Sequence, residues 1–268
     1  MFELTDRDYA SYALPDIDLE AQLLAVRSLL SRNRTADEAL IEEISRLGKQ
    51  AQAATGPNSW HLVDHHVDLL HGSVYHDAAN SMSAVGMLAP MIESVFVGLF
   101  RSIGRQGWPL NSHKRSKRAG EGHEAFWNPQ IYFPKPPETH RTDLTLGIPQ
   151  LVEATGMEAA MAPDYKAVLK ALFVYRNRMF HNGFEWPKAT RAEFASLIET
   201  EGWPDDWFSR ATSGGEPWVF YMSELLIERC FEVLDKALDG AGRHIRELSR
   251  ELGWKEEVIK TAPETKTE

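Results

Sequence analysis

The chain contains a single cysteine among 268 residues, which excludes an intramolecular disulfide framework. Cys230 stands in an apolar, helical run and is therefore expected to be a buried, reduced thiol, as is typical of cytoplasmic proteins. A secretory leader is also missing, because residues 1–8 are acidic and polar rather than basic and then apolar. These absences predict a cytoplasmic protein.

Long apolar runs are scarce as well. The most apolar stretch, residues 85–100, contains Pro90, Glu93 and Ser94 and is too short to cross a bilayer. It therefore predicts a buried core helix, and we expect a soluble protein without a membrane partner. The hydrophobic fraction of 43% and the charged fraction of 25% are ordinary for a globular protein with a sizeable core.

The chain also lacks an excess of positive charge. Its formal net charge of −10 argues against unselective nucleic-acid binding, because affinity for phosphate comes mainly from Lys and Arg. Positive charge is concentrated in one run inside the segment 104–137, which has Gly and Pro but no sustained period. This segment is predicted to be a loop that is either solvated or in contact with RNA. The candidate RNA-binding residues are Lys114, Arg115, Lys117 and Arg118.

No convincing alternation of apolar and polar residues indicates a strand, so the predicted fold class is all-α. We interpret residues 1–56 as an N-terminal helical extension, 57–252 as a helical bundle and 253–268 as a partly disordered tail. Periodicity predicts helices over residues 18–31, 35–53, 60–80, 81–103, 148–160, 164–182, 190–199 and 217–252.

The helix predicted over residues 164–182 carries a polar triplet and a histidine at its end, in the run Arg176-Asn177-Arg178-Met179-Phe180-His181. At about 100° per residue, Arg176 projects onto the apolar face, where its guanidinium needs a carboxylate, carbonyl groups or a phosphate. Asn177 and His181 lie four residues apart, so the amide can reach the imidazole and fix its tautomer. Pro163 and Gly183 mark the two ends of this helix.

The surroundings of this run lead to further expectations. Arg178 projects to the far side of the helix and is predicted to be a solvated charge or a second phosphate contact. Glu93, a lone carboxylate in an apolar sequence, is predicted to meet Arg176 and hold its guanidinium in place. The connection 183–218 is rich in Trp and Pro and is expected to fold back as an ordered cap beside Arg176 and His181.

This run resembles the active-site signature of the HEPN superfamily, in which an arginine is followed by a polar residue, three further positions and a histidine. Many members of this superfamily are helical, metal-independent RNA-cleaving enzymes. The resemblance implies a helical bundle of HEPN type that dimerises with the motif helices near the two-fold axis. It further implies the catalytic residues Arg176, Asn177 and His181, an RNA substrate cleaved to a 2′,3′-cyclic phosphate, and no cofactor. A toxin–antitoxin or antiviral role with an inhibitory protein partner is plausible for such a nuclease.

Three other interpretations stay open. The motif can be structural, because a histidine near a helix C-terminus stabilises the macrodipole and an arginine there can pair with a buried acid. The chain can then be a non-catalytic binding or dimerisation module for a nucleotide, RNA or protein. Finally, His61, His65 and Asp68 share one predicted helical face and could ligate zinc in a metal-dependent hydrolase. No further zinc motif accompanies them, so a polar helix face is the simpler interpretation.

Overall fold

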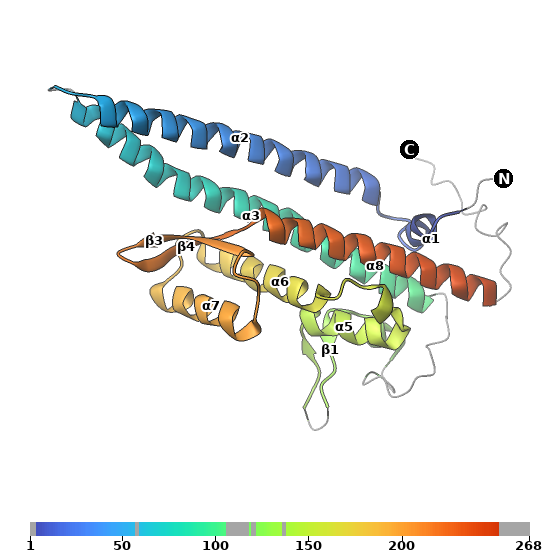
Figure 1. Ribbon diagram of the computed structural model, residues 1–268. Helices are drawn as coiled ribbons and strands as arrows, with labels where there is room; N and C mark the ends of the chain where they lie inside the picture. Colours follow the sequence, from blue (N-terminus) through green and yellow to red (C-terminus); the bar gives the residue numbers. More distant parts are fainter. Residues whose placement is uncertain (1–3, 57–58, 106–117, 119–121, 136–137, 252–268) are drawn as a thin grey trace, which may run out of the picture. The chain divides into compact units, whose positions relative to one another are not determined.

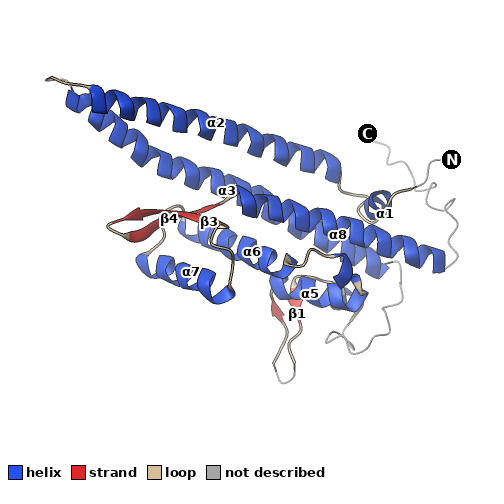
Figure 2. Cartoon of the chain, in the orientation of Figure 1, coloured by secondary structure: helices blue, strands red, loops and turns tan. Residues whose placement is uncertain are grey.

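The computed structural model describes residues 4–56, 59–105, 118, 122–135 and 138–251. Helices predominate in this part of the chain, and its strands form two short hairpins, so the predicted all-α class is confirmed (Figure 2). The elements are α1 (Asp6–Tyr12), α2 (Leu19–Ala53), α3 (Ser59–Arg105), α4 (His123–Phe126), β1 (Ile131–Tyr132), β2 (Arg141–Thr142), α5 (Leu144–Thr155), the 3-10 helix η1 (Met157–Ala160), α6 (Tyr165–Asn182), α7 (Lys188–Glu201), β3 (Phe208–Ser213), β4 (Glu216–Met222) and α8 (Glu224–Glu251) (Figure 1).

The chain folds into two compact units, each assembled from segments that are distant in sequence. The first unit comprises Met1–Leu19, Pro90–Lys170 and Cys230–Glu268, and the second comprises Glu20–Ala89 and Ala171–Arg229. Helices α3, α6 and α8 each contribute residues to both units. The division at residue 56 into an extension and a bundle stays a prediction, and the tail lies outside the described residues.

Two pairs of predicted helices are single long helices. Helix α2 runs unbroken where helices over residues 18–31 and 35–53 were expected, because the intervening Arg32-Asn33-Arg34 contains neither Gly nor Pro. Helix α3 likewise continues through Gly72 and Pro90. Apolar residues on both sides of Pro90, such as Leu88 and Ile92, are fully buried, and this burial outweighs the hydrogen bond that proline removes.

Helix α3 is long and apolar enough to cross a membrane by length and composition alone. Its most apolar window is, however, 56% buried inside the protein, as in the core helix of a globular protein. The predicted core stretch accounts for this burial, because Val85, Leu88, Phe96 and Phe100 are each at most 1% exposed. Cys230 is also fully buried and free, as predicted, and burial raises the pKa of its thiol.

In the first unit, helices α1 and α8 are held together by close backbone packing and by ion pairs. A Cβ added to Gly242 of α8 would lie 1.7 Å from the Asp6 carbonyl oxygen, so only glycine permits this approach. Arg7 pairs with Asp235 at 2.7 Å, and Arg246 pairs with Asp6 at 2.8 Å. The same unit contains α5, whose predicted range of 148–160 is divided at Gly156 into α5 and η1.

The second unit contains a β-hairpin that the sequence-based prediction missed. Strand β4 occupies residues expected to start a helix over 217–252, and α8 begins only at Glu224. Gly214 and Gly215 form the turn with φ of 60° and 82°, which suits the two-residue hairpin loops that need positive φ at both positions. In Figure 1, β3 and β4 lie beside α7. The Gly-Gly pair between two aromatic segments was the available signal for this hairpin.

An aromatic cluster centred on Phe194 of α7 forms the core between α6, α7 and the hairpin. The rings in contact with the fully buried Phe194 have centroids 5.0 to 6.4 Å away and belong to Tyr175, Trp186, Trp203, Phe208 and Phe220. The Tyr175 hydroxyl also donates a hydrogen bond of 2.9 Å to the Phe220 carbonyl oxygen. The connection 183–218 therefore packs on the side of α6 that carries Tyr175. Its predicted position as a cap beside Arg176 and His181 stays a prediction.

Replacing Phe194 tests whether this cluster holds the second unit together. We expect Phe194→Ala to lower the free energy of unfolding by about 3–5 kcal/mol, because five aromatic neighbours lose their common contact. The matched control is Phe180→Ala, which removes a ring that is 58% exposed and should cost at most about 1 kcal/mol. Urea denaturation followed by far-UV circular dichroism measures both values, and equal losses for the two variants would contradict the expectation.

Candidate functional site

The motif residues lie in the last two turns of α6. This helix ends at Asn182, and Gly183 follows with φ of 72° while its N–H donates a hydrogen bond of 2.9 Å to the Met179 carbonyl oxygen. The predicted range 164–182 is thus correct to within one residue. Asn177 and His181 are exposed and Arg176 is partly buried. Solvent therefore reaches Asn177 and His181 freely and Arg176 in part.

Arg176 rests against the apolar side of its own helix. The guanidinium carbon lies 5.7 Å from the centroid of the Phe173 ring, within range of a cation–π contact. Glu93, its predicted partner, belongs to the other compact unit and accepts a hydrogen bond of 2.7 Å from the Gln130 side-chain amide. The pairing of Glu93 with Arg176 stays a prediction.

Asn177 does not orient His181 in the way the spacing suggested. Within the described residues, no hydrogen bond joins the Asn177 amide to the His181 imidazole. Both side chains are exposed, so water satisfies their polar atoms and no burial forces them into contact. A spacing of four residues permits this bond but does not by itself hold two solvated side chains together.

Arg178 is engaged in a structural contact. Its side chain is only 24% exposed, pairs with Glu193 of α7 at 3.4 Å and lies 6.0 Å from the Phe194 ring. The predicted solvated charge is therefore instead an ion-paired one, because α7 covers this side of the motif helix, and the alternative of a second phosphate contact stays a prediction. A phosphate contact through Arg178 would require it to leave Glu193.

Phe180, inside the motif run, is a feature that the sequence analysis missed. The ring is 58% exposed, and the residue lies one position before His181. Its Cζ atom lies 3.3 Å from the place where a Cβ on Gly86 would stand, so the ring leans on α3 where that helix has no side chain. An exposed ring beside an arginine and a histidine can stack on a nucleobase or on a partner protein.

The prediction that Arg118 contacts RNA is wrong. Its side chain is fully buried, and its guanidinium donates hydrogen bonds to backbone carbonyl oxygens. The carbonyl acceptors closest to it belong to Phe126 at 2.6 Å, Asn128 at 3.0 Å and Gly147 at 3.3 Å, and Ile131 is a fourth. Burial lowers the pKa of Arg118 to about 10, so it remains charged at neutral pH. The other three candidates, Lys114, Arg115 and Lys117, lie outside the described residues.

The histidines of α3 do not form a metal site. No group of three potential ligands that could hold a metal ion occurs among the described residues, which include His61, His65 and Asp68. These three side chains are exposed on the helix. The neighbouring His66 instead packs on α2, where its ring lies 2.9 Å from the position of a Cβ on Gly48. The zinc-hydrolase alternative therefore has no supporting geometry.

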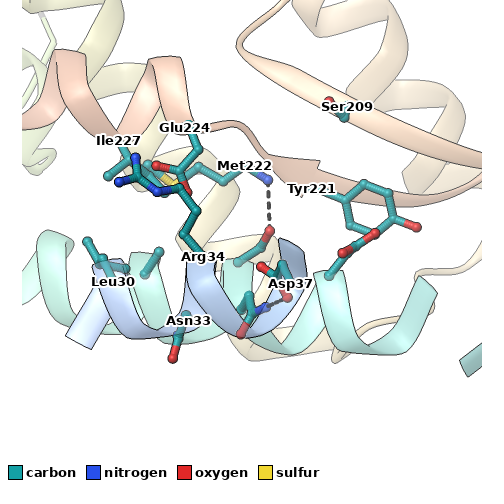
Figure 3. Close-up of a pocket in the computed structure, with 13 residues that line it drawn as sticks. Leu30, Asn33, Arg34, Asp37, Ser209, Tyr221, Met222, Glu224 and Ile227 are labelled. Carbon is teal, nitrogen blue, oxygen red and sulfur yellow. Dashed lines mark hydrogen bonds between the residues drawn. The ribbon is translucent and has the colours of Figure 1, made fainter. Parts of the chain in front are cut away.

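A polar cavity in the second unit is the other candidate site (Figure 3). Its volume is about 220 Å³, and α2, α3, β3, β4 and the first turns of α8 all contribute to its wall. The residues that line it are Leu30, Asn33, Arg34, Asp37, Asp77, Asn80, Ser81, Ala84, Ser209, Tyr221, Met222, Glu224 and Ile227. The Ser81 hydroxyl accepts a hydrogen bond of 3.0 Å from the Met222 backbone N–H, which ties the hairpin to α3.

Carboxylates dominate the electrostatics of this cavity. Asp37 accepts a hydrogen bond of 2.6 Å from the Asn80 amide and lies 3.2 Å from Nε2 of His76. Desolvation, with the nearby charge of Asp37, raises the pKa of Asp77. Desolvation also raises the pKa of Glu224, although the positive charge of Arg34 opposes this shift. The cavity can therefore offer hydrogen-bond acceptors, together with two carboxyl groups whose pKa is raised, to a small polar molecule.

The sequence analysis missed this cavity because its residues come from five separate elements. Asp37 lies inside the continuous helix α2. Its actual partners, Asn80 and His76, are more than 35 positions away along the chain. No local spacing in the sequence indicates such an arrangement.

Comparisons of the whole chain with protein-family models, with curated proteins and with solved structures gave no match. The resemblance to the HEPN superfamily thus depends on the motif residues of α6 and on the helical character of the chain.

Removing the Asp77 carboxylate tests the electrostatics of the cavity. A carboxyl group whose pKa is raised by folding contributes stability below its unfolded pKa of about 4, and this contribution is lost as the pH rises through the folded pKa. We therefore expect Asp77→Asn to be more stable than the parent at pH 7, by about 0.2–1 kcal/mol because the side chain is exposed to solvent. Urea denaturation between pH 3 and pH 8 should show this gain shrinking towards pH 3, and a gain independent of pH would contradict it.

Arg118 offers a test of the buried cation. We expect Arg118→Ala to lower the free energy of unfolding by about 2–4 kcal/mol, because several buried carbonyl groups lose a charged donor. Arg118→Lys should recover only part of this loss, since an ammonium group cannot reach the same set of acceptors. The control is Arg141→Ala at a site that is 54% exposed, where the loss should stay below about 1 kcal/mol. Chemical denaturation compares the three variants.

Proposed function

We propose that this protein is a metal-independent endoribonuclease of HEPN type whose reactive groups are Arg176, Asn177 and His181. The observation that supports the proposal is their joint exposure at the end of α6, with Arg176 partly buried and His181 open to solvent. An arginine held against a hydrophobic surface keeps its charge and loses little freedom on binding a phosphate. An exposed imidazole can accept and donate a proton as a general acid–base group.

The proposed reaction is an attack of the RNA 2′-hydroxyl on the adjacent phosphorus. The new O2′–P bond forms as the bond from phosphorus to the 5′ oxygen breaks, which leaves a 2′,3′-cyclic phosphate and a free 5′-hydroxyl. His181 accepts the proton of the 2′-hydroxyl, and Arg176 stabilises the negative charge that develops on the phosphate oxygens. Asn177, one residue after Arg176, donates a hydrogen bond from its amide N–H to the substrate, or to the imidazole once the substrate has displaced water.

A single histidine per chain cannot act as base and acid in the same turnover without a proton carrier. We therefore include in the proposal a homodimer in which two α6 helices meet and two His181 side chains face one cleft. One His181 accepts the proton of the 2′-hydroxyl, and the other donates a proton to the departing 5′ oxygen. The half-exposed Phe180 is placed to contact either the second chain or a base of the substrate. Because DNA lacks the 2′-hydroxyl, it is not cleaved.

Incubation of the purified full-length chain with RNA in excess EDTA tests the proposal. We expect cleavage to persist in EDTA and to fall at least 100-fold in His181→Ala, since a general acid–base group contributes about 10²–10⁴ in rate. The matched control is His65→Ala, which removes another exposed histidine outside the motif and should retain parental activity. An oligonucleotide with a single 2′-deoxy sugar at the cleaved position should resist cleavage there.

The remaining outcomes each lead to a definite conclusion. Cleavage by His181→Ala at the parental rate contradicts the mechanism. Absence of cleavage by the parent, together with retained binding of RNA, a nucleotide or a protein, identifies a non-catalytic module. Loss of cleavage only on addition of EDTA indicates a metal-dependent enzyme instead.

A further inference from the structure

The N-terminal half of α3 carries a continuous apolar stripe that faces solvent. Its members are Trp60, Val63, Val67 and Leu70, which are 55%, 46%, 55% and 45% exposed. At about 100° per residue all four project within about 80° of one another, so they form one ridge along the helix. The side of α3 that packs on α2 adjoins this ridge, because His66, which contacts Gly48, projects about 40° beyond Leu70.

The spacing of this stripe is the spacing of a coiled-coil seam. Successive members are three, four and three residues apart, as are the a and d positions of a heptad repeat. The stripe continues along the same face of α3 into Ala78 and Val85, which are fully buried within the protein. This face of α3 is therefore buried by the rest of the protein at Ala78 and Val85, but it is exposed over the three turns from Trp60 to Leu70.

We propose that the stripe is the seam of an antiparallel homodimer, in which α3 of one chain pairs with α3 of a second copy. The spacing three, four, three reads the same in both directions, so a two-fold axis beside residue 65 superposes the stripe on itself. Trp60 then faces Leu70 of the second copy, and Val63 faces Val67 of the second copy. Isologous contacts of this kind are the commonest form of homo-oligomer interface.

The available area sets the strength of this pairing. A fully buried aromatic side chain covers about 150–250 Å², so four half-exposed apolar side chains cover at most about 500 Å² per copy, or about 1,000 Å² for the pair. This area is below the roughly 1,200 Å² of stable specific interfaces and is that of a weak, reversible dimer. Asp64 flanks the seam in both copies at its solvent edge, where water and salt weaken the mutual repulsion. The dimer should accordingly dissociate at micromolar concentrations.

This pairing is separate from the dimer that the proposed nuclease requires. Gly86, which the motif residue Phe180 contacts, lies 21 residues from the two-fold axis, so the motifs of the two chains stand about 60 Å apart along the paired helices at 1.5 Å per residue. The stripe therefore cannot bring two His181 side chains into one cleft. A chain that uses both surfaces forms assemblies larger than a dimer.

Disulfide trapping tests the register of the seam. A mixture of Val63→Cys and Val67→Cys proteins should form a covalent dimer under mild oxidation, whereas each protein alone should do so at least tenfold more slowly. The native Cys230 is fully buried and does not compete. Rapid trapping of Val63→Cys with itself would mean that the helices are parallel and would overturn the proposal. A mixture of Leu24→Cys and Ile41→Cys, at exposed apolar sites on α2, measures random collision.

Sedimentation equilibrium of the full chain provides the second measurement. The parent should exceed its monomer mass of 30.3 kDa at tens of micromolar, and Val67→Glu should weaken association at least tenfold. Ile41→Glu, at a site that is 66% exposed, should associate like the parent. A monomeric parent, or equal association of parent and Val67→Glu, would refute the seam. The measurement reports association and not RNA cleavage, so failure of the seam and failure of the proposed nuclease are distinguishable.

Discussion

Enclosure of Tyr175 by other aromatic side chains determines how α6 is rotated about its own axis. Its ring packs against Trp186, Phe194 and Phe208, and its hydroxyl is satisfied by a backbone carbonyl of β4. Because successive residues of a helix are about 100° apart, burial of this one side chain directs Asn177 and His181 away from the core. The exposure of the motif thus follows from packing on the opposite side of the helix.

The same packing explains why two neighbouring arginines have different environments. Arg178 lies towards α7 and is held by Glu193, while Arg176 lies against Phe173. The positive charge of Arg178, on the side that faces α7, is offset by the carboxylate of Glu193. Only two residues of helix therefore separate a structural cation, Arg178, from Arg176, the cation proposed to bind phosphate.

The sequence predicted those features that depend on neighbours along the chain. Pro163 and Gly183 bound α6 to within one residue, and the density of Trp and Pro indicated an ordered connection after it. The hairpin was missed because its aromatic strand residues also fit the start of a helix, and only the Gly214-Gly215 turn distinguishes the two. Arg118 was misread because its partners are backbone carbonyl groups, which every residue carries and no sequence pattern displays. The cavity around Asp37 could not be predicted, since it depends on how five elements meet.

The way the chain passes between its two compact units limits how the protein can be divided. The backbone crosses from one unit to the other four times, after Leu19, Ala89, Lys170 and Arg229, and three of these crossings fall inside the continuous helices α3, α6 and α8. No single truncation yields either unit intact, and limited proteolysis at surface loops cannot release one of them as a stable fragment.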